Sequence, residues 1–276
     1  MSNVPEIKIV LINELLLHET EDPIRTKRLE ERLIADGFLK NPVIVGRIAH
    51  GNSKFLLLDG VNRVSALKNL GFKDIVAQIA DYFDRNLRIA NWCHLVHGFK
   101  RQNLLRKIED IEGVSLEKTD RQEAERLLEQ KKIISYLLFK NEDVFIIKSS
   151  DDLKTRTLKL GEVVGACCKY STIHRILKTE AESLLKKQMT ATAALITPTY
   201  EKEEIVNLAS AKIRLPSGVT RHIIPSRVLN LHVSLALLKV ELPIEQKNKV
   251  VQEMISQSLA YEKARFYSES VFVFDE

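Results

Sequence analysis

The chain has few cysteines and no long apolar run, and both deficits exclude classes of protein. Its three cysteines, Cys93, Cys167 and Cys168, form no C-x-x-C pair, so the regularly spaced ligands of a structural zinc site are missing. A bridge between adjacent cysteines is strained, so we expect buried or half-buried thiols in a reducing compartment. No segment approaches the ~20 apolar residues of a membrane helix, and no signal-peptide pattern opens the chain. These absences predict a cytoplasmic protein without a membrane partner.

Blocks of like charge are also missing, although the chain is basic overall. Its net charge is +5, with 45% hydrophobic and 29% charged residues. Lysines and arginines alternate with glutamates, which is typical of solvated helix surfaces rather than of a nucleic-acid-binding stripe. Anionic ligands such as nucleotides agree with this charge. DNA is possible but not favoured, because no helix-turn-helix segment is evident after residue 82.

The length and the order of the expected elements indicate an α+β protein with two lobes. A chain of 276 residues suffices for one large domain or two modest ones. We place a compact α/β unit at residues 1–83 and a mixed α/β lobe at residues 84–276. A cleft between the two is the expected ligand site.

Hydrophobic periodicity predicts the individual elements. In the first unit it predicts a helix over residues 23–36, a strand over 43–46, a helix ending at Leu70 and a strand over 75–79. Beyond that unit it predicts helices over residues 84–104, 106–132 with a break near Gly113, 158–177, 201–209 and 244–261. It also predicts a hairpin of strands over 133–139 and 144–148, a strand, turn and strand over 213–221, and a final strand over 270–274.

The most informative stretch is Leu56-Leu57-Leu58-Asp59-Gly60-Val61-Asn62-Arg63, an apolar strand that passes through a tight turn into a helix. A helix N-terminus presents unpaired backbone N–H groups, and Arg63 adds a guanidinium, so the turn suits a phosphate group. Asp59 stands at the mouth of the turn, where its carboxylate could hold Mg²⁺ against the phosphates. Taken alone, the pattern also fits a surface turn in which Asp59 caps the helix and Arg63 is solvated.

The surroundings of this turn resemble a known family. Upstream lie Leu17-His18-Glu19-Thr20, an amphipathic segment, and Gly37-Phe38-Leu39-Lys40-Asn41-Pro42 before a β-rich run. This order resembles the ParB/sulfiredoxin-like nucleotide-binding domain, and within it the free L-serine kinases, which carry the His-Glu pair and an Asp-Gly-x-His-Arg turn. Near the C-terminus, Gly218-Val219-Thr220-Arg221-His222 and residues 226–239 resemble the serine-binding part of these kinases. They are most similar to the branch from staphyloferrin B siderophore clusters.

The resemblance implies catalytic roles for Glu19 and Asp59. Glu19 would take the proton of the substrate hydroxyl, a role worth about 10²–10⁴ in rate, and Asp59 would hold the metal. Without the resemblance, Glu19 could equally be a capping carboxylate among Glu21 and Asp22. The residues implied to bind nucleotide and phosphate are His18, Asp59, Gly60, Val61, Asn62 and Arg63. Asn62 stands where these kinases have histidine, and it can donate a hydrogen bond but carries no charge.

The resemblance also implies a site for L-serine, formed by Trp92, Thr220, Arg221, His222 and Arg227. We expect Arg221 to hold the serine carboxylate as a bidentate pair, with polar contacts from Thr220 and His222. Strand alternation turns Arg221 away from these two residues, unless a turn at Gly218 lets all three converge. Trp92 would close the pocket or be an ordinary core residue.

His94 and His97 suggest a metal or haem site beside Trp92 and Cys93, because the two histidines are three residues apart in a predicted helix. No third ligand accompanies them. Structural or substrate-pocket roles therefore fit this segment better.

Together these features predict a kinase that uses Mg²⁺ and transfers a phosphoryl group from ATP or ADP to free L-serine. Its product, O-phospho-L-serine, would pass to a pyridoxal-phosphate enzyme of siderophore or amino-acid biosynthesis. The alternative is a ParB-like DNA-binding regulator of a siderophore gene cluster. A sulfiredoxin-like reductase would need a reactive cysteine beside the turn, where Val61 and Asn62 stand instead. The choice between ATP and ADP, and the oligomeric state, stay open.

Overall fold

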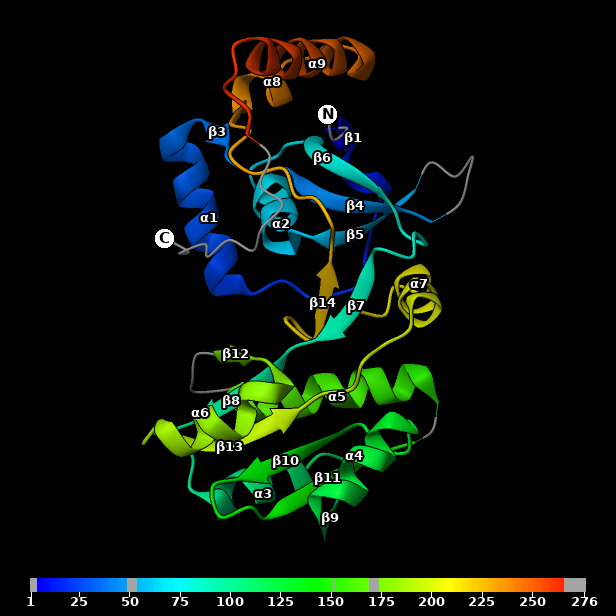
Figure 1. Ribbon diagram of the computed structural model, residues 1–276, viewed down its shortest axis with the longest axis vertical. Helices are drawn as coiled ribbons and strands as arrows, with labels where there is room; N and C mark the ends of the chain where they lie inside the picture. The colour runs from blue at the N-terminus through cyan, green and yellow to red at the C-terminus, as the bar shows by residue number, and fades with distance from the viewer. Residues whose placement is uncertain (1–3, 49–53, 151, 169–173, 266–276) are drawn as a thin grey trace.

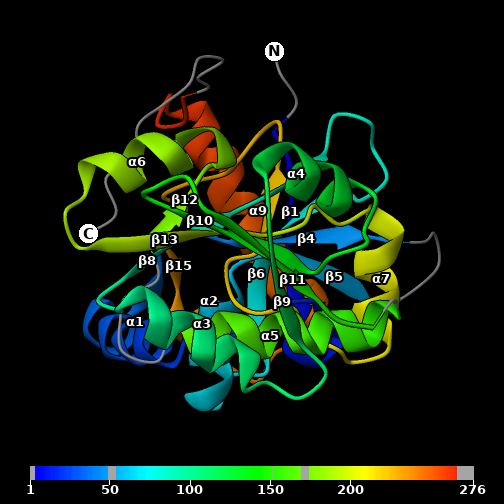
Figure 2. The ribbon, with the colours of Figure 1, turned by 90° about the horizontal axis from the view of Figure 1, so that it is seen from below.

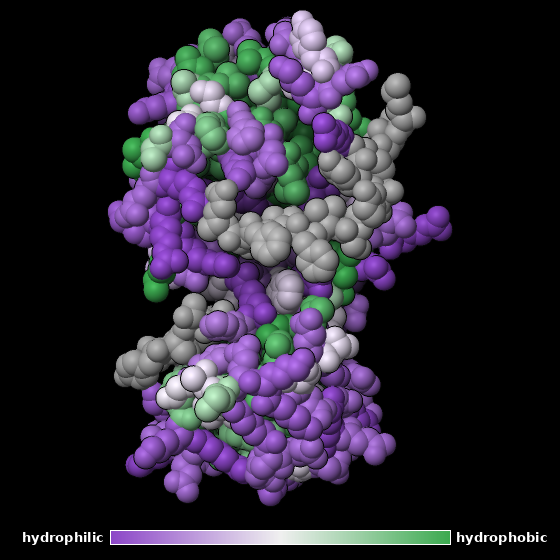
Figure 3. Space-filling model, turned by 60° about the vertical axis from the view of Figure 1, so that its left-hand side comes forward, coloured by the Kyte–Doolittle hydropathy of each residue, from purple (hydrophilic) through white to green (hydrophobic). Residues whose placement is uncertain are grey.

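The computed structural model describes residues 4–48, 54–150, 152–168 and 174–265. Two lobes lie one above the other along the long axis, and each is built on a β-sheet with helices packed against it (Figure 1). From another side the molecule narrows to a waist between the lobes, and the surface of the lower lobe is mostly hydrophilic (Figure 3). The mixture of helices and strands confirms the α+β class.

The upper lobe is built on a five-stranded mixed sheet with the order β1-β6-β4-β5-β2. Its elements are β1 (Glu6–Leu11), η1 (Ile12–Glu14), β2 (Leu15–Leu17), α1 (Pro23–Asp36), β3 (Phe38–Leu39), β4 (Val43–Arg47), β5 (Phe55–Asp59), α2 (Val61–Asn69) and β6 (Asp74–Asp81). The helices and strands predicted for this part of the chain are all confirmed, because their amphipathic patterns and turn residues agree with the packing that the sheet offers.

The two helices of this lobe begin in different ways. The side chain of Asp22 caps α1 by accepting hydrogen bonds from two backbone N–H groups of its first turn, and Pro23 occupies the first position. By contrast, α2 follows Gly60, whose φ is +107°, and no side chain caps its N-terminus. The first turn of α2 therefore keeps backbone donors available for a ligand.

The last described elements return to the upper lobe. They are β15 (Val233–Ser234), α8 (Leu235–Lys239) and α9 (Ile244–Ala260). β15 pairs with β3, and α9 lies across β1 at the top of the molecule (Figure 1). The upper lobe thus takes residues from both halves of the chain, while the division at residue 83 stays a prediction.

A buried ion pair anchors α9 to this lobe. Lys247 pairs with Asp74 of β6, and its Nζ also donates a hydrogen bond to the carbonyl of Leu238 (2.9 Å). The two residues are only 3% and 7% exposed. Asn248 accepts a hydrogen bond from the N–H of Ile9 (2.7 Å), which extends the attachment to β1.

The lower lobe is built on a six-stranded antiparallel sheet with the order β12-β8-β13-β10-β11-β9. Its elements are β8 (Cys93–His97), α3 (Arg101–Glu109), β9 (Ser115–Thr119), α4 (Arg121–Glu129), β10 (Ser135–Phe139), β11 (Val144–Lys148), α5 (Leu153–Cys168), β12 (His174–Ile176), η2 (Lys178–Glu180), α6 (Ala181–Lys187) and β13 (Ala191–Ile196). α4 and α6 cover one face of the sheet, and α3 and α5 cover the other (Figure 2). The predicted hairpin is confirmed as β10 and β11.

Three elements form the waist. β7 (Arg88–Asn91) pairs with β14 (Thr220–Ile223) in antiparallel fashion, and α7 (Lys202–Ser210) lies beside them (Figure 1). One apolar cluster continues through the waist, with Leu58 from the upper sheet and Leu195 from the lower sheet among its members. The lobes are therefore joined by packed side chains and not only by connecting loops.

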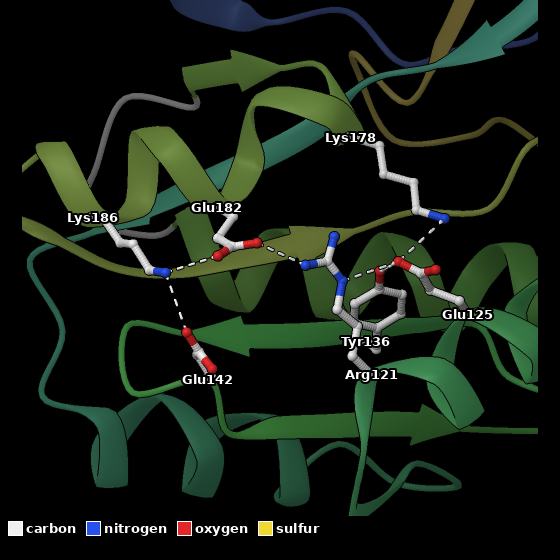
Figure 4. Close-up of polar contacts among 7 residues, drawn as sticks. All are labelled: Arg121, Glu125, Tyr136, Glu142, Lys178, Glu182 and Lys186. Atoms are coloured by element: carbon white, nitrogen blue, oxygen red, sulfur yellow. Dashed lines mark hydrogen bonds and ion pairs between the residues drawn. The ribbon is translucent and has the colours of Figure 1, made fainter.

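A chain of ion pairs runs over the surface of the lower lobe (Figure 4). It consists of Lys178–Glu125, Arg121–Glu125, Arg121–Glu182, Lys186–Glu182 and Lys186–Glu142. The Tyr136 hydroxyl donates to Glu125 (3.5 Å), and burial raises the pKa of this tyrosine. Single exposed pairs contribute at most about 1 kcal/mol, so the network mainly connects α4, α6 and the β10–β11 hairpin.

The predicted helix over residues 84–104 is wrong. The segment forms β7 and β8, and a helix begins only at Arg101. Residues 93–96 are no more than 2% exposed, because helices cover both faces of the sheet. Periodicity cannot distinguish a strand buried on both faces from a buried helix. In a strand, His94 and His97 point to opposite faces, and no group of three or more potential metal ligands exists among the described residues.

Three other predictions are wrong in part. Residues 106–132 are not one interrupted helix, because the charged edge strand β9 separates α3 from α4. The helix predicted over residues 158–177 ends at Cys168, and β12 follows it. Of residues 213–221, only those from Thr220 join a strand. The strand predicted over residues 270–274 lies outside the described residues.

Two of the three cysteines have described side chains, and both agree with the expected burial. Cys93 and Cys167 are buried thiols. Burial raises the pKa of Cys93, which keeps this thiol protonated and unreactive. Within the ranges given above, no helix has the length and apolar character to span a membrane.

We expect Lys247→Ala to lower the free energy of unfolding by about 3–5 kcal/mol, because it leaves the Asp74 carboxylate buried without its cation. Lys249→Ala, on the exposed side of the same helix, is the matched control and should change stability by less than about 0.5 kcal/mol. Urea denaturation followed by circular dichroism measures both. Equal stability of the two variants would contradict the assigned role of the pair.

Candidate active site

The candidate site forms where two segments far apart in the sequence run side by side at the waist. The N–H of Leu215 donates to the carbonyl of His18 (2.7 Å), and the N–H of Thr20 donates to the carbonyl of Leu215 (2.9 Å). The N–H of Ser217 adds a hydrogen bond to the Thr20 hydroxyl (3.1 Å). This pairing holds Glu19 against residues 218–220.

The Glu19 carboxylate accepts three hydrogen bonds from this second segment. Its Oε1 accepts from the N–H of Thr220 (2.7 Å) and from the Thr220 hydroxyl, and its Oε2 accepts from the N–H of Gly218 (3.2 Å). Gly218 has a φ of +73°, a conformation that L side chains rarely adopt. The half-buried carboxylate is therefore held in one orientation by backbone donors.

Two buried histidines lie behind Glu19. His18 Nε2 is 2.9 Å from the Thr220 hydroxyl, and because that hydroxyl donates to Glu19, His18 must donate here. His222 packs edge-on against the ring of His18, with ring centroids 5.1 Å apart. Burial lowers the pKa of His18, against the opposing charge of Glu19. Burial, followed by the nearby His18, lowers the pKa of His222 to about 3. Both rings are therefore neutral at physiological pH.

The turn after β5 forms a second cluster around Asp59. Asp59 Oδ2 accepts hydrogen bonds from Arg63 (3.2 Å) and from Arg227 (2.9 Å). Burial raises the pKa of this carboxyl, but the two guanidinium groups outweigh it and hold the pKa below its usual value. A Cβ at Gly60 would lie 2.7 Å from Val43 Cγ1, so the turn requires glycine on steric grounds as well.

The side chains of Arg63 and Asn62 make structural hydrogen bonds that the sequence does not suggest. Arg63 Nη1 donates to the carbonyls of Asn41 (3.1 Å) and Pro42 (2.6 Å), so this guanidinium ties the turn to the start of β4. Asn62 Oδ1 accepts from the N–H of Asp22 (2.8 Å), which joins the N-terminus of α2 to that of α1. Val61 packs against the core of the upper lobe.

Arg221 and Trp92 form a third group. The guanidinium of Arg221 lies 4.7 Å from the centroid of the Trp92 ring, in a cation–π contact. Strand alternation persists in β14, so Thr220 and His222 are buried toward His18 while Arg221 points to the other face. Arg227 joins Asp59 and also donates to the carbonyl of His222 (3.4 Å), which connects the turn with β14.

Gln78, His94 and Arg175 also shape this region; no motif marks Gln78 or Arg175, and the sequence drew attention to His94 only through its spacing from His97. Gln78 Nε2 donates to the carbonyl of Ser226 (2.6 Å), and its Oε1 accepts from the N–H of Val228 (2.9 Å). His94 Nε2 donates to the carbonyl of Gly218 (2.8 Å). In the sequence, Gln78 and His94 are recognisable as polar residues inside apolar strands. Nothing in the sequence marks Arg175.

The donor set at Asp59 fits Mg²⁺ bound together with a nucleotide. Both arginines bind Oδ2, so Oδ1 makes no hydrogen bond to the described residues. Mg²⁺ is usually held by one or two carboxylates, waters and substrate phosphates rather than by an all-protein cage. Asp59 Oδ1 is the oxygen that would hold the ion.

The buried histidines predict an acid-sensitive fold. His222 stays neutral in the folded state down to about pH 3, whereas in the unfolded chain it protonates near 6.5. Its contribution to stability is thus complete above pH 6.5 and is lost as the pH falls toward 3.

When the pH is lowered from 6.5 to 4.5, the free energy of unfolding should fall for both proteins. The fall should be smaller for His222→Gln than for the parent by roughly 2–3 kcal/mol, at ~1.4 kcal/mol per pH unit. His174→Gln, which replaces an exposed histidine, serves as the control and should follow the parent. Urea midpoints measured across this pH range decide the matter. Parallel pH profiles for the parent and His222→Gln would refute the prediction.

No protein-family model matches the chain. The ATP-dependent L-serine kinase SbnI of Staphylococcus aureus is 27% identical over 286 residues, covering 100% of this chain and 100% of that protein. The ADP-dependent L-serine kinase SerK of Thermococcus kodakarensis is 25% identical, over 71% of this chain and 77% of its own length. A solved free serine kinase in complex with AMP aligns with a TM-score of 0.72 at 22% identity, over 86% of this chain and 95% of the other.

The structural likeness shows the shared fold, and the two sequence likenesses extend over most of each protein. They agree with the resemblance carried by the His18-Glu19 pair, the Asp59 turn and the segment from Gly218. The chain is similar over most of its length to proteins named as L-serine kinases in two organisms.

Proposed function

We propose that the protein is a free L-serine kinase that transfers a phosphoryl group from ATP or ADP to the serine hydroxyl. The observation that carries this proposal is the meeting of Glu19 with the segment 218–222 beside the Asp59 turn. A carboxylate base and a phosphate-binding helix N-terminus are what an alcohol kinase needs at one place. The named activities of the two relatives support the same reaction.

In the proposed reaction the serine oxygen attacks the terminal phosphorus of the nucleotide. Glu19 takes the hydroxyl proton, the new oxygen–phosphorus bond forms, and the bond from phosphorus to the bridging oxygen breaks. ATP would leave as ADP, and ADP would leave as AMP. Mg²⁺ held by Asp59 would neutralise charge on the phosphates. Because Glu19 already accepts three hydrogen bonds, its carboxylate needs little reorientation before it accepts the proton.

The proposed nucleotide site is the N-terminus of α2. Backbone N–H groups from Gly60 to Arg63 would bind the phosphates, with His18 close behind Glu19. The side chain of Asn62 contributes through the position of α2 rather than through charge, since its Oδ1 is bonded to the backbone of Asp22.

The proposed serine site lies along β14 and β7. Thr220 and His222 would orient the substrate near Glu19, whereas Arg221 and Trp92 lie on the other face of β14 and would attract the serine carboxylate from there. Arg227 connects this region with Asp59. The product would suit a pyridoxal-phosphate enzyme that uses O-phospho-L-serine. No observation favours the DNA-binding alternative.

Incubation of the protein with L-serine, Mg²⁺ and either ATP or ADP tests the function directly. We expect O-phospho-L-serine, detected by mass spectrometry, with at least one of the two nucleotides. D-serine and L-threonine serve as comparison substrates. Absence of phosphoserine with both nucleotides would overturn the proposal.

Glu19→Gln should reduce kcat by at least about a hundredfold, the lower end for a lost general base. The amide keeps the size of the side chain but does not take up the proton, so L-serine and nucleotide affinities measured by calorimetry should stay close to the parent values. Glu21→Gln is the matched control, because Glu21 pairs with exposed Arg214 (3.3 Å) outside the cluster. If Glu21 were the sensitive position, the base would be misassigned by two residues.

A further inference from the structure

Arg175 crosses the waist from the lower lobe to the candidate site. It lies in β12, the edge strand of the lower sheet, opposite His94 of β8. Its Nη2 donates to the Ser217 hydroxyl (3.2 Å). The guanidinium covers Gly218 so closely that a Cβ at that position would lie 2.1 Å from Arg175 Nε. The absent side chain at Gly218 thus makes room for the arginine beside the backbone that holds Glu19.

The guanidinium of Arg175 has unused hydrogen-bonding capacity. An arginine carries five N–H donors, and within the described ranges Arg175 uses one of them on a neutral hydroxyl and forms no ion pair. Arg63 and Arg227 differ, because both are bonded to Asp59 and to backbone carbonyls. Unlike Arg63 and Arg227, Arg175 therefore keeps most of its donors available to an anionic ligand.

The charges around Arg175 come from both clusters of the site. Although its surface is open to solvent, partial desolvation at the waist lowers the pKa of Arg175. The Glu19 carboxylate opposes that shift most strongly, and Asp22 and Asp59 act in the same direction as Glu19. Arg25 adds to the lowering. The charge of the proposed base therefore acts on this guanidinium more strongly than the charge of Asp59 in the phosphate turn.

We infer that Arg175 binds the phosphoryl group during its transfer from the nucleotide to serine. This inference rests on the proposed kinase function and adds a catalytic residue to it. The phosphoryl group moves between the turn at Asp59 and the hydroxyl at Glu19, and Arg175 is subject to the charge of both residues. A planar guanidinium with free donors matches two phosphoryl oxygens and stabilises the charge that they carry in the transition state.

The competing role for Arg175 is to hold the carboxylate of serine. The two roles differ in which ligand loses affinity when the arginine is replaced. L-serine and O-phospho-L-serine share the carboxylate and differ only in the phosphoryl group. Their dissociation constants therefore separate the roles without any need for turnover.

The experiment compares the parent protein with Arg175→Gln and Arg175→Lys, and with Arg126→Gln as the control. Arg126 is exposed on α4, and among the described residues its guanidinium bonds only to Glu123 and to Gln130 at the end of the same helix. Calorimetry without nucleotide gives the affinities for L-serine and O-phospho-L-serine, and steady-state kinetics gives kcat and KM. Circular dichroism checks that each variant is folded.

For Arg175→Gln we expect O-phospho-L-serine affinity to fall by at least about tenfold, the usual loss for a charged hydrogen bond. L-serine affinity should change by less than about twofold, and kcat should fall by at least about a hundredfold. Arg175→Lys should recover part of both losses because it retains the charge. Arg126→Gln should match the parent.

Two results would overturn the inference. Equal weakening of L-serine and O-phospho-L-serine would assign Arg175 to the carboxylate, and unchanged kcat and affinities would exclude it from the site. Both leave the proposed kinase function intact, because the parent protein still forms phosphoserine. A parent protein that forms no phosphoserine would instead refute the proposed function itself.

Discussion

The hydrogen bonds between Glu19 and the segment 218–220 are the interaction on which the candidate site depends. A loop near the start of the chain supplies the carboxylate, and a strand near its end supplies the donors. Such a contact closes a very long loop, and its entropic cost must be offset elsewhere. The apolar cluster through the waist provides that offset, because it packs the upper sheet, the lower sheet and α7 together. The position of the proposed base is therefore a property of the whole fold.

The arginines of the site differ in their partners. Some make structural hydrogen bonds within the site, and others keep N–H donors that a ligand could use. Arg63 and Arg227 hold Asp59 in its ionised form, and each also donates to at least one backbone carbonyl. They fix the turn, and the carboxylate keeps one oxygen unbonded. Arg221 is held by the ring of Trp92 on the other face of β14. Arg175 donates a single hydrogen bond, to a neutral hydroxyl, among the described residues, which distinguishes it from Arg63 and Arg227.

The neutral histidines set a limit on this arrangement. His18 and His222 are buried behind Glu19, where a positive charge on either ring would be poorly solvated. Their neutral rings let His18 donate a hydrogen bond to Thr220 while Thr220 donates to Glu19. The Lys247–Asp74 pair performs a similar structural task at the opposite end of the upper lobe, where α9 covers β1. The Lys247 and Asp74 charges have defined partners, whereas Nδ1 of His18 and Nδ1 of His222 are buried without a hydrogen-bond partner among the described residues.

The sequence by itself determined the upper lobe and the two ends of the site. Pro23, Gly60 and the alternation of apolar residues act within a few residues of one another, so α1, α2 and the strands around them follow from local rules. The hairpin of β10 and β11 is of the same kind. The His18-Glu19 pair and the Asp59 turn are recognisable because their residues are adjacent in the chain.

Only the tertiary structure decided how these pieces combine. β8 is indistinguishable from a helix in sequence because both of its faces are buried, and β9 is an exposed edge whose charges are typical of a helix surface. Contacts between distant segments decide which side of β14 faces Glu19. They also decide that Arg63 bonds to the carbonyls of Asn41 and Pro42 and that Arg175 lies against Gly218. No local pattern encodes such contacts, since they arise only when two lobes share one core.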